Sequence, residues 1–249
     1  MTKTLQGKVA LVTGASKGIG AAIALKLAAE GAAVAVNYAS SKDGADKVVK
    51  QIEAAGGKAV AVHGDLSQPA NAEKLVAETV KALGKIDVLV NNAGVYEMLP
   101  LDAITPEHFH RQFNINVLGL LLVTQAAARQ FNDGGSIVNI SSGASTLAMP
   151  GSSVYGATKA SVDLITAIHA KELAPRKIRV NSVNPGMVVT EGVKAAGYDS
   201  SEMRGQIEAI TPLGRVGEAD EIAAVVAFLA SGGASYVTGE TLHVTGGLK

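Results

Sequence analysis

The stretch LVTGASKGIGAAIALKLAAEG, residues 11–31, decides the fold, because it passes from an apolar strand directly into a helix. Gly14, Gly18 and Gly20 lie at the join, with Lys17 among them. Ligands of parallel sheets bind beyond the carboxyl ends of the strands, and a helix that begins there offers unpaired N–H groups to a phosphate. The stretch therefore predicts a site for a nucleotide diphosphate, and a tight turn with no ligand is the alternative. Its spacing differs from G-x-x-x-x-G-K-[ST], which disfavours a phosphate-transferring P-loop.

Apolar runs of strand length recur along the whole chain. They comprise residues 9–13, 33–37, 59–63, 86–91, 136–141, 178–185 and 241–245, with helical patterns between them, for example at 18–30, 42–55 and 71–83. The runs are apolar almost throughout, as expected for a parallel sheet that is covered on both faces. The sequence therefore predicts one α/β domain over residues 1–249, built on a doubly wound, seven-stranded parallel sheet with helices on both faces. Residues 186–212 are polar and poorly periodic, which predicts a long substrate loop.

The composition disfavours several classes of function. The 22 Lys and Arg residues balance the 22 Asp and Glu residues, so no net charge favours binding to nucleic acid or to an anionic membrane. Cys is absent, which excludes disulfides, thiolate metal sites and a cysteine nucleophile. The opening MTKTLQGK lacks the apolar region of a signal peptide, and no uncharged apolar run reaches the ~18 residues of a membrane span. We therefore expect a cytoplasmic protein with no nucleic-acid or membrane partner.

Five short motifs follow one another along the chain: TGASKGIG (13–20), NNAG (91–94), NISS (139–142), YGATK (155–159) and NPG (184–186). In this order and spacing they resemble the short-chain dehydrogenase/reductase family, and the resemblance extends to the closing SYVTGETLHVTGG, residues 235–247. The resemblance implies a Rossmann fold and an oxidoreductase that transfers hydride between a nicotinamide cofactor and a ketone or secondary alcohol. A non-enzymatic NADP sensor is an alternative from another class, but a sensor would not need the residues that the family uses for catalysis.

Tyr155 and Lys159 stand four residues apart, so they share one face of a helix. A free Tyr hydroxyl has a pKa of about 10, and a nearby ammonium group would stabilise the phenolate and lower that pKa. Such a hydroxyl could exchange a proton with a carbonyl or alcohol oxygen. The same pair is common on solvated helices. The resemblance implies that Tyr155 is the general acid/base and that Lys159 tunes it and binds the nicotinamide ribose.

The resemblance assigns two further catalytic residues. Ser142, thirteen residues before Tyr155, matches the serine that holds the substrate oxygen. Asn116 matches the asparagine that anchors a water linked to the lysine, which completes a proton relay. Residue type alone does not distinguish these two from Ser141 and Asn114, and the resemblance favours Ser142 and Asn116.

The second predicted strand ends in VNYASSK, residues 36–42, without the carboxylate that usually binds the ribose of NAD. A 2′-phosphate would not be repelled there, and Lys17 stands where NADP-preferring relatives carry a basic residue. We therefore predict NADP as the cofactor, with NADPH preferred over NADH. Asp65 matches the acid that binds the adenine amino group, or it caps the next helix. The predicted cofactor-binding residues are Gly14, Ser16, Lys17, Gly18, Ile19, Gly20, Asn37, Tyr38, Ser40, Ser41, Lys42, Asp65, Leu66, Asn92, Ala93, Gly94, Tyr155, Lys159, Pro185, Gly186, Val188 and Thr190.

The predicted substrate pocket is mostly apolar, which favours a hydrophobic ketone or ketoester. By family position it comprises Ser142 together with Val95, Tyr96, Met149, Pro150, Met187, Val193 and Tyr198. Two alternatives stay open: a 3-oxoacyl-carrier-protein reductase, and a glucose or other sugar 1-dehydrogenase, which the carboxyl-terminal stretch resembles. An acidic carrier protein would require basic residues near the cleft.

Many members of the family form homotetramers, and the sequence gives partial support for such an assembly. Residues 118–128, LGLLLVTQAAA, are apolar around more than one helical face, and the helix that starts at Tyr155 carries a wide stripe with Leu164 and Ile168. No metal site is predicted, because His108 and His110 would diverge on a helix and no third ligand is evident.

Overall fold

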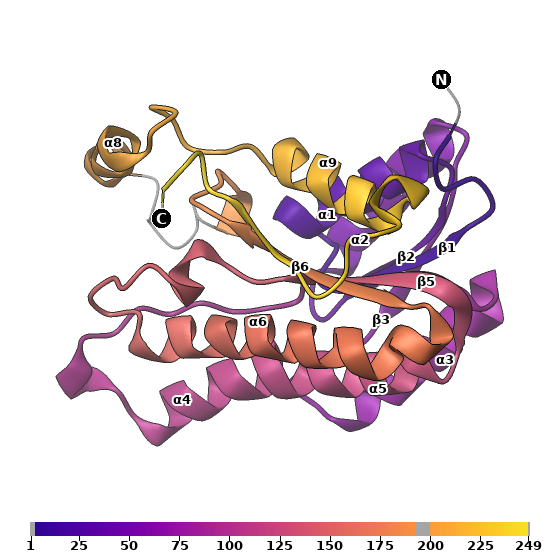
Figure 1. The fold of residues 1–249 in the computed structure, drawn as a ribbon, viewed down its shortest axis with the longest axis horizontal. Coiled ribbons are helices and arrows are strands. Elements are labelled where there is room, and N and C mark those ends of the chain that lie inside the picture. The colour runs from indigo at the N-terminus through magenta and orange to yellow at the C-terminus, as the bar shows by residue number, and fades with distance from the viewer. Residues whose placement is uncertain (1–2, 193–199, 249) are drawn as a thin grey trace.

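The computed structural model describes residues 3–192 and 200–248. Within them, seven parallel strands form one sheet in the order β3-β2-β1-β4-β5-β6-β7 (Figure 1). The predicted doubly wound parallel sheet is therefore confirmed. The strands are β1 (Val9–Val12), β2 (Ala33–Tyr38), β3 (Lys58–His63), β4 (Ile86–Asn91), β5 (Phe131–Ile140), β6 (Arg179–Pro185) and β7 (Thr241–Val244).

Helices connect the strands and flank the sheet. The α-helices are α1 (Gly18–Ala29), α2 (Lys42–Ala54), α3 (Ala70–Leu83), α4 (Pro106–Phe113), α5 (Leu120–Ala128), α6 (Ser153–Leu173), α8 (Ser201–Ile210) and α9 (Ala219–Ala230). A π-helical turn, η2 (Asn114–Gly119), joins α4 to α5, and four short 3₁₀ turns are η1 (Leu101–Ala103), η3 (Gly143–Ser145), η4 (Ala174–Arg176) and η5 (Gly232–Ala234). None of the helices in the described ranges is long and apolar enough to span a membrane.

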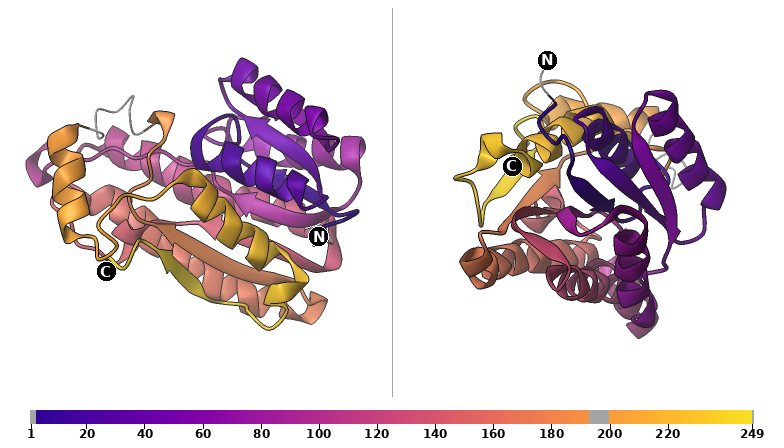
Figure 2. Two further views of the ribbon diagram at one scale, coloured as in Figure 1. Left: turned by 90° about the horizontal axis from the view of Figure 1, so that it is seen from above. Right: turned by 90° about the vertical axis from the view of Figure 1, so that its right-hand side faces the viewer.

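Two apolar layers cover the two faces of the sheet. Helices α1, α2 and α9 pack on one face, whereas α3, α5 and part of α6 pack on the other (Figures 1 and 2). Within β1, Ala10 and Val12 belong to the first layer and Leu11 to the second, because successive side chains of a strand point to opposite faces. This two-sided burial explains why the strands read as continuous apolar runs.

The sequence prediction fails at two places along the chain. Strand β5 begins at Phe131 rather than at residue 136, and its register against β4 shifts between Ile86 and Val88. The segment 186–212 is not a loop throughout, because residues 201–210 form α8. Val193 and Tyr198, two predicted substrate contacts, lie outside the described residues.

The carboxyl ends of the strands lie at one edge of the sheet. Strand order reverses direction between β1 and β4, and such a switch point is where ligands of open α/β sheets bind. Strands β1, β4, β5 and β6 end here, and they are followed directly by the motifs TGASKGIG, NNAG, NISS and NPG. The fold therefore brings the predicted motifs to one edge.

Candidate active site

The glycine loop after β1 is bound tightly to the NNAG motif after β4. The Thr13 hydroxyl accepts hydrogen bonds from the backbone N–H groups of Asn92 and Ala93, at 2.9 and 3.0 Å. Asn92 Nδ2 donates to the carbonyl oxygens of Thr13 and Gly14, at 2.9 and 3.0 Å. A Cβ atom on Gly14 would lie 2.9 Å from Ala93 Cα, and one on Gly20 would lie 2.4 Å from Gly14 O. Two of the three glycines are thus required by the packing of the chain itself, which the sequence did not indicate.

The first N–H group of α1 already holds an anionic oxygen. Gly18, with φ of 58°, donates its N–H to Glu191 Oε2 at 3.1 Å. Helix α1 has no acidic residue in its first turn, and the side chain of its N-cap, Lys17, does not cap it. A helix N-terminus favours negative charge, so Glu191 stands where a phosphate oxygen would be accepted. The donor set therefore fits the diphosphate of a dinucleotide.

Asn37 has a structural role that the sequence did not reveal. It is 1% exposed, and its Oδ1 accepts from Gly14 N at 3.0 Å. Its Nδ2 donates to the carbonyl oxygens of Val62 and Gly64, at 3.3 and 3.0 Å. The side chain thus joins the glycine loop to the end of β3.

The other predicted ribose contacts lie at the surface beside the glycine loop. Lys17 and Ser40 are exposed, whereas Ser41 is half-buried at the start of α2. Lys42 is exposed and forms an ion pair with Asp46, at 2.5 Å. Lys17, unlike Lys42, makes no ion pair with any of the described residues.

The remaining predicted cofactor contacts line the same edge. Asp65 is half-buried, and its Oδ1 accepts from Ser67 N at 2.9 Å within the turn that precedes α3. The alternative that Asp65 caps this helix is wrong, because the N-cap of α3 is Pro69 and no side chain caps it. Val188 is buried and forms an isolated bridge with Gly217, while Gly186 donates its N–H to the carbonyl oxygen of Val244 at 3.0 Å. The predicted nicotinamide side of the site is therefore anchored to the end of β7.

Lys159 and Tyr155 lie on the first turns of α6, against the end of β5. Lys159 is 6% exposed, and its Nζ donates to the Ile140 carbonyl oxygen at 2.9 Å. The same nitrogen lies 5.7 Å from the centroid of the Tyr155 ring. The Ser141 hydroxyl donates to the Lys159 carbonyl oxygen at 3.0 Å, which ties α6 to β5. Ser141 therefore supports the helix, whereas the next residue faces the site.

Ser142 follows β5 with an extended backbone, and its side chain forms a hydrogen bond with that of Tyr155. Its position depends on residues that the sequence analysis missed. Asn184 Nδ2 donates to the Ser142 carbonyl oxygen at 3.2 Å and to Asp163 Oδ2 at 2.9 Å. Asn184 is part of the NPG motif, and Asp163 stands four residues after Lys159. That spacing puts Asp163 on the same helix face as the predicted catalytic pair, and it could have indicated from the sequence that Asp163 belongs to the site.

Asn116 is buried in the π-helical turn, whereas Asn114 is exposed. Its Oδ1 accepts from Val95 N and its Nδ2 donates to Val95 O, both at 2.8 Å. Nδ2 also donates to the hydroxyl of Thr158, at 3.0 Å. A Cβ atom added to Gly94 would lie 3.2 Å from Asn116 Oδ1 and 3.6 Å from Lys159 Nζ, so these groups are neighbours. Sequence resemblance and burial thus select the same asparagine.

Comparison with known proteins identifies the family. A family model described as Enoyl-(Acyl carrier protein) reductase matches residues 14–249. A solved short-chain dehydrogenase/reductase from Serratia marcescens is 40% identical, covers 98% of this chain and 99% of its own, and superposes with a TM-score of 0.94. The chain belongs to the short-chain dehydrogenase/reductase family. It is an NAD(P)-dependent oxidoreductase that acts on CH–OH groups.

Other relatives of this short-chain dehydrogenase/reductase differ in what their names say they act on. An uncharacterized oxidoreductase of Methylorubrum extorquens is 58% identical, over 98% of this chain and 99% of the relative. An L-rhamnose 1-dehydrogenase (NAD(P)(+)) of a Sphingomonas species is 42% identical, over 99% and 98%. A 3-oxoacyl-[acyl-carrier-protein] reductase of Staphylococcus epidermidis is 41% identical, over 97% and 98%. A short chain dehydrogenase from Burkholderia cenocepacia, solved in complex with NADP, is 38% identical over 98% and 99%, with a TM-score of 0.93.

Burial shifts both ionisable groups of this short-chain dehydrogenase/reductase toward their neutral forms. It raises the pKa of Tyr155, while the hydrogen bond with Ser142 opposes that rise and the nearby Tyr96 adds to it. Burial also lowers the pKa of Lys159 to about 8, against the attraction of Asp163. Desolvation thus dominates the pKa of Tyr155 in the chain alone, and the expected lowering by Lys159 stays a prediction for the cofactor complex.

The predicted substrate side lies next to Tyr155. The ring of Tyr96 meets that of Tyr155 edge to face, with centroids 6.2 Å apart. Met149 is exposed after η3, and Met187 is half-buried after β6. In the described ranges no group of three His, Asp or Glu side chains could hold a metal ion.

Proposed function

We propose that this short-chain dehydrogenase/reductase is an NADPH-dependent reductase of apolar ketones or ketoesters, with Tyr155 as the general acid. The observation that carries the proposal is the convergence of Asn116, Ser142, Tyr155 and Lys159 at the edge that also holds the glycine loop. A non-enzymatic sensor would have no use for this buried arrangement.

When bound, NADPH would supply the hydride. The Gly18 N–H would hold its diphosphate, Lys17 its 2′-phosphate and Lys159 its nicotinamide ribose. The NADP complex of the Burkholderia cenocepacia relative supports this choice of cofactor. Asn37 is assigned no direct contact, because its side chain is engaged with the backbone.

The four predicted catalytic side chains would divide the proton transfer between them. Ser142 holds the carbonyl oxygen beside Tyr155, and Tyr155 gives that oxygen its phenolic proton as the alcohol forms. The raised pKa of Tyr155 keeps the proton in place before reduction. The side chain of Asn116 is engaged with Val95 and Thr158, so its part in the relay falls to its backbone carbonyl.

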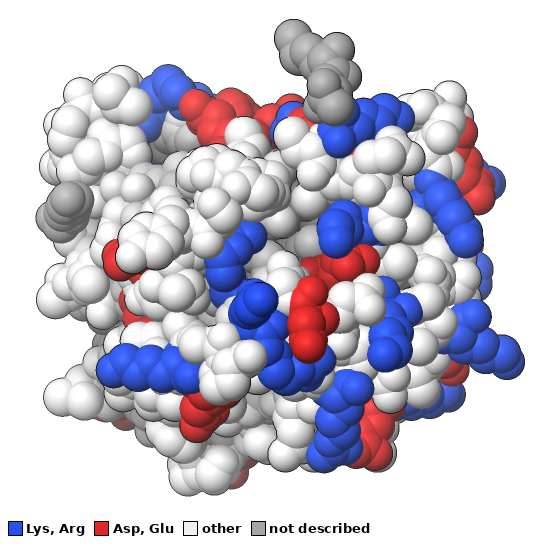
Figure 3. Space-filling model, turned by 45° about the vertical axis from the view of Figure 1, so that its right-hand side comes forward, with Lys and Arg blue, Asp and Glu red and all other residues white. Residues whose placement is uncertain are grey.

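The distribution of charge favours a small apolar substrate over an acidic carrier protein. The face of the molecule seen in Figure 3 carries Lys and Arg side chains interspersed with Asp and Glu side chains. A hollow of about 420 Å³ is lined by Lys8, Lys177 and Arg179, among others, and none of the predicted site residues lines it. Arg129, the basic residue in the segment 128–136, is paired with Glu73, at 3.1 Å. These basic residues thus give no support for a docking site for an acidic carrier protein at the candidate active site.

The test is NADPH oxidation against a panel of aryl and alkyl ketones, ketoesters, 3-oxoacyl thioesters and, in the reverse direction, sugars with NADP. We expect the highest kcat/KM for an apolar ketone or ketoester. A higher value for a carrier-bound 3-oxoacyl thioester or for a sugar would assign the protein to the activity named for one of its relatives. No turnover of any carbonyl would refute the proposal.

We further propose a homotetramer. Leu164 and Ile168 on α6 are 64% and 44% exposed, and Phe228 on α9 and Tyr236 are 47% and 102% exposed. Soluble proteins tend to bury such apolar surface in an interface. Light scattering at micromolar concentration should give about four times the 25.2 kDa of one chain, and a mass near one chain would refute the assembly.

A further inference from the structure

Tyr96 packs beside the reactive centre and is partly exposed to solvent. Its ring is edge to face with that of Tyr155, and 36% of the residue is exposed. A Cβ atom on Gly192 would lie 3.5 Å from the Tyr96 hydroxyl, so the segment after β6 passes on its other side. Tyr96 thus offers its ring to a carbonyl compound that binds beside Tyr155.

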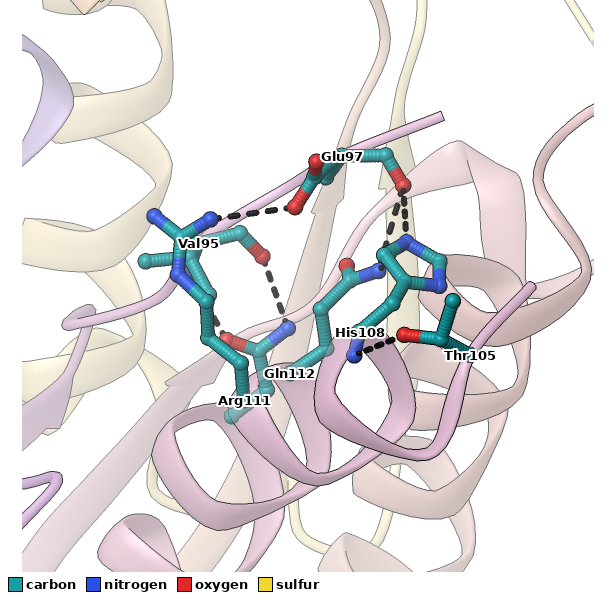
Figure 4. Close-up of polar contacts among 7 residues, drawn as sticks. Val95, Glu97, Thr105, His108, Arg111 and Gln112 are labelled. Atoms are coloured by element: carbon teal, nitrogen blue, oxygen red, sulfur yellow. Dashed lines mark hydrogen bonds and ion pairs between the residues drawn. The ribbon is translucent and has the colours of Figure 1, made fainter. Parts of the chain in front are cut away.

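Residues 95–97 are fixed to α4 and η2 on both sides of Tyr96. Before it, the backbone of Val95 is bound in both directions by Asn116. After it, the carbonyl oxygen of Glu97 accepts from Gln112 Nε2 at 3.1 Å and lies 3.1 Å from His108 Nε2. Positions 108, 112 and 116 recur every four residues and so share one helix face, which is turned toward residues 95–97 (Figure 4).

His108 and Gln112 also orient each other. Gln112 Nε2 lies 2.8 Å from His108 Nε2. An amide nitrogen carries two hydrogens, so it can donate to the Glu97 carbonyl oxygen and to the imidazole nitrogen together, with the His108 proton on Nδ1. Thr105 Oγ1 accepts from His108 N at 3.2 Å and caps α4 at the same place (Figure 4).

This polar pair is costly in its position. His108 is 7% exposed and Gln112 is fully buried, yet His108 Nδ1 and Gln112 Oε1 have no hydrogen-bond partner among residues 3–192 and 200–248. A buried polar atom without a partner destabilises a fold, and two apolar side chains could fill the same space without that cost. Packing alone therefore does not explain why polar residues occupy these two positions, whereas the hydrogen bond to the Glu97 carbonyl oxygen does.

We propose that His108 and Gln112 are positioning residues that hold Tyr96 in one place over Tyr155, and that through Tyr96 they favour ketones with a flat aromatic group over small aliphatic ketones. The exposed part of the Tyr96 ring gives an aromatic substituent a fixed surface to pack against. This inference rests on the proposed function for its substrate class. The hold on residues 95–97 does not depend on it.

The exposed Arg111 supplies a matched control. Its Nη1 bonds the Glu97 carboxylate at 3.0 Å, with the two side chains 60% and 42% exposed. Exposed ion pairs contribute little, so R111Q should leave residues 95–97 in place. The test variants are Q112M, which keeps the volume, and H108L with Q112M. H108Q keeps an acceptor within reach of Gln112 Nε2 and should behave like the original chain.

The first measurement is amide hydrogen exchange in the protein without ligands. Val95 N–H donates to Asn116 and Leu99 N–H donates to Gly151 O, so these two amides report on both ends of the segment. We expect exchange at Leu99 to rise about tenfold in Q112M and more in the double variant, with no rise in R111Q and none in α1. Unchanged exchange at Leu99 would overturn the positioning role, and a rise throughout the protein would show a general loss of stability instead.

The second measurement is the ratio of kcat/KM for acetophenone to that for butanone. We expect it to fall about fivefold in Q112M, mainly through KM for acetophenone, while the NADPH dissociation constant stays unchanged. Y96A should lower the ratio as much, and adding Q112M to Y96A should lower it no further, because the effect passes through Tyr96. Additive losses, or a ratio that Q112M does not change, would overturn the assignment. If the unaltered protein reduces no carbonyl, the proposed function fails, and the exchange measurement still decides the positioning role.

Discussion

The catalytic side and the ribose side of the site are built differently. Asn116 and Lys159 are 2% and 6% exposed, and each has hydrogen bonds to fixed backbone atoms. Lys17 and Ser40, on the ribose side, are exposed. Groups of the first kind are arranged before any ligand arrives, whereas groups of the second kind acquire their geometry with the ligand. Substitutions on the catalytic side should therefore change kcat/KM or stability strongly. Substitutions on the ribose side should change cofactor preference and affinity by smaller factors.

The largest effect is expected from Tyr155→Phe. The change removes the hydroxyl that would transfer the proton and keeps the ring, so kcat/KM should fall by ~10²–10⁴ while NADPH affinity stays within a few-fold. Steady-state kinetics and a fluorescence titration of NADPH measure the two quantities. More than a tenth of the original activity would show that another group supplies the proton.

A second prediction concerns the buried charge of Lys159, whose pKa burial lowers from 10.5 to about 8. The unfolded chain binds the proton more tightly, so stability relative to Lys159→Met should be constant below pH 8 and should increase from pH 8 to 10.5. The full change is about 3 kcal/mol in the free energy of unfolding. Urea unfolding of both proteins across this range checks it, and a constant difference would mean that the ammonium group is solvated.

Lys17→Ala tests the ribose side. A charge-assisted hydrogen bond to a phosphate contributes ~1.5–3 kcal/mol, so the original protein should prefer NADPH over NADH by about ten- to a hundredfold in kcat/KM. Removing Lys17 should lower this preference by about tenfold. Lys42→Ala is the control and should change it less, because Lys42 is paired with Asp46. Equal effects of the two changes would place the phosphate nearer to α2.

The smallest effect is expected from Glu191→Gln. The Glu191 carboxylate accepts from the Gly18 N–H, which the diphosphate would need, so the neutral variant should bind NADPH more tightly. Exposed contacts of this kind are worth up to about 1 kcal/mol, so the gain should not exceed about fivefold and should shrink at high salt. Calorimetry at two salt concentrations measures it. Weaker binding would show that Glu191 assists the cofactor instead of competing with it.

Local patterns predicted the sheet, because a strand that is buried on both faces is a run of consecutive apolar residues. They did not predict the role of Asn37, whose partners belong to the glycine loop and to the end of β3. Asp at this position would lose the two donations to Val62 and Gly64, so it would disturb the loop as well as repel a phosphate. Nor did local patterns predict that burial raises the pKa of Tyr155 in the chain alone, because desolvation depends on neighbours from several elements.

The π-helical turn at Asn114–Gly119 has a consequence for changes in chain length. Before it, Gln112 faces residues 95–97; after it, Val123 and Ala127 pack into the core under the sheet. A π turn holds more residues than an α turn, and each residue of a helix rotates the next by about 100°. Deleting one residue here would rotate the helix face of Gln112 by about that angle relative to the face of Val123 and Ala127. Either the contacts with residues 95–97 or the packing under the sheet would then be lost. Insertions and deletions in this turn should therefore be selected against among homologues.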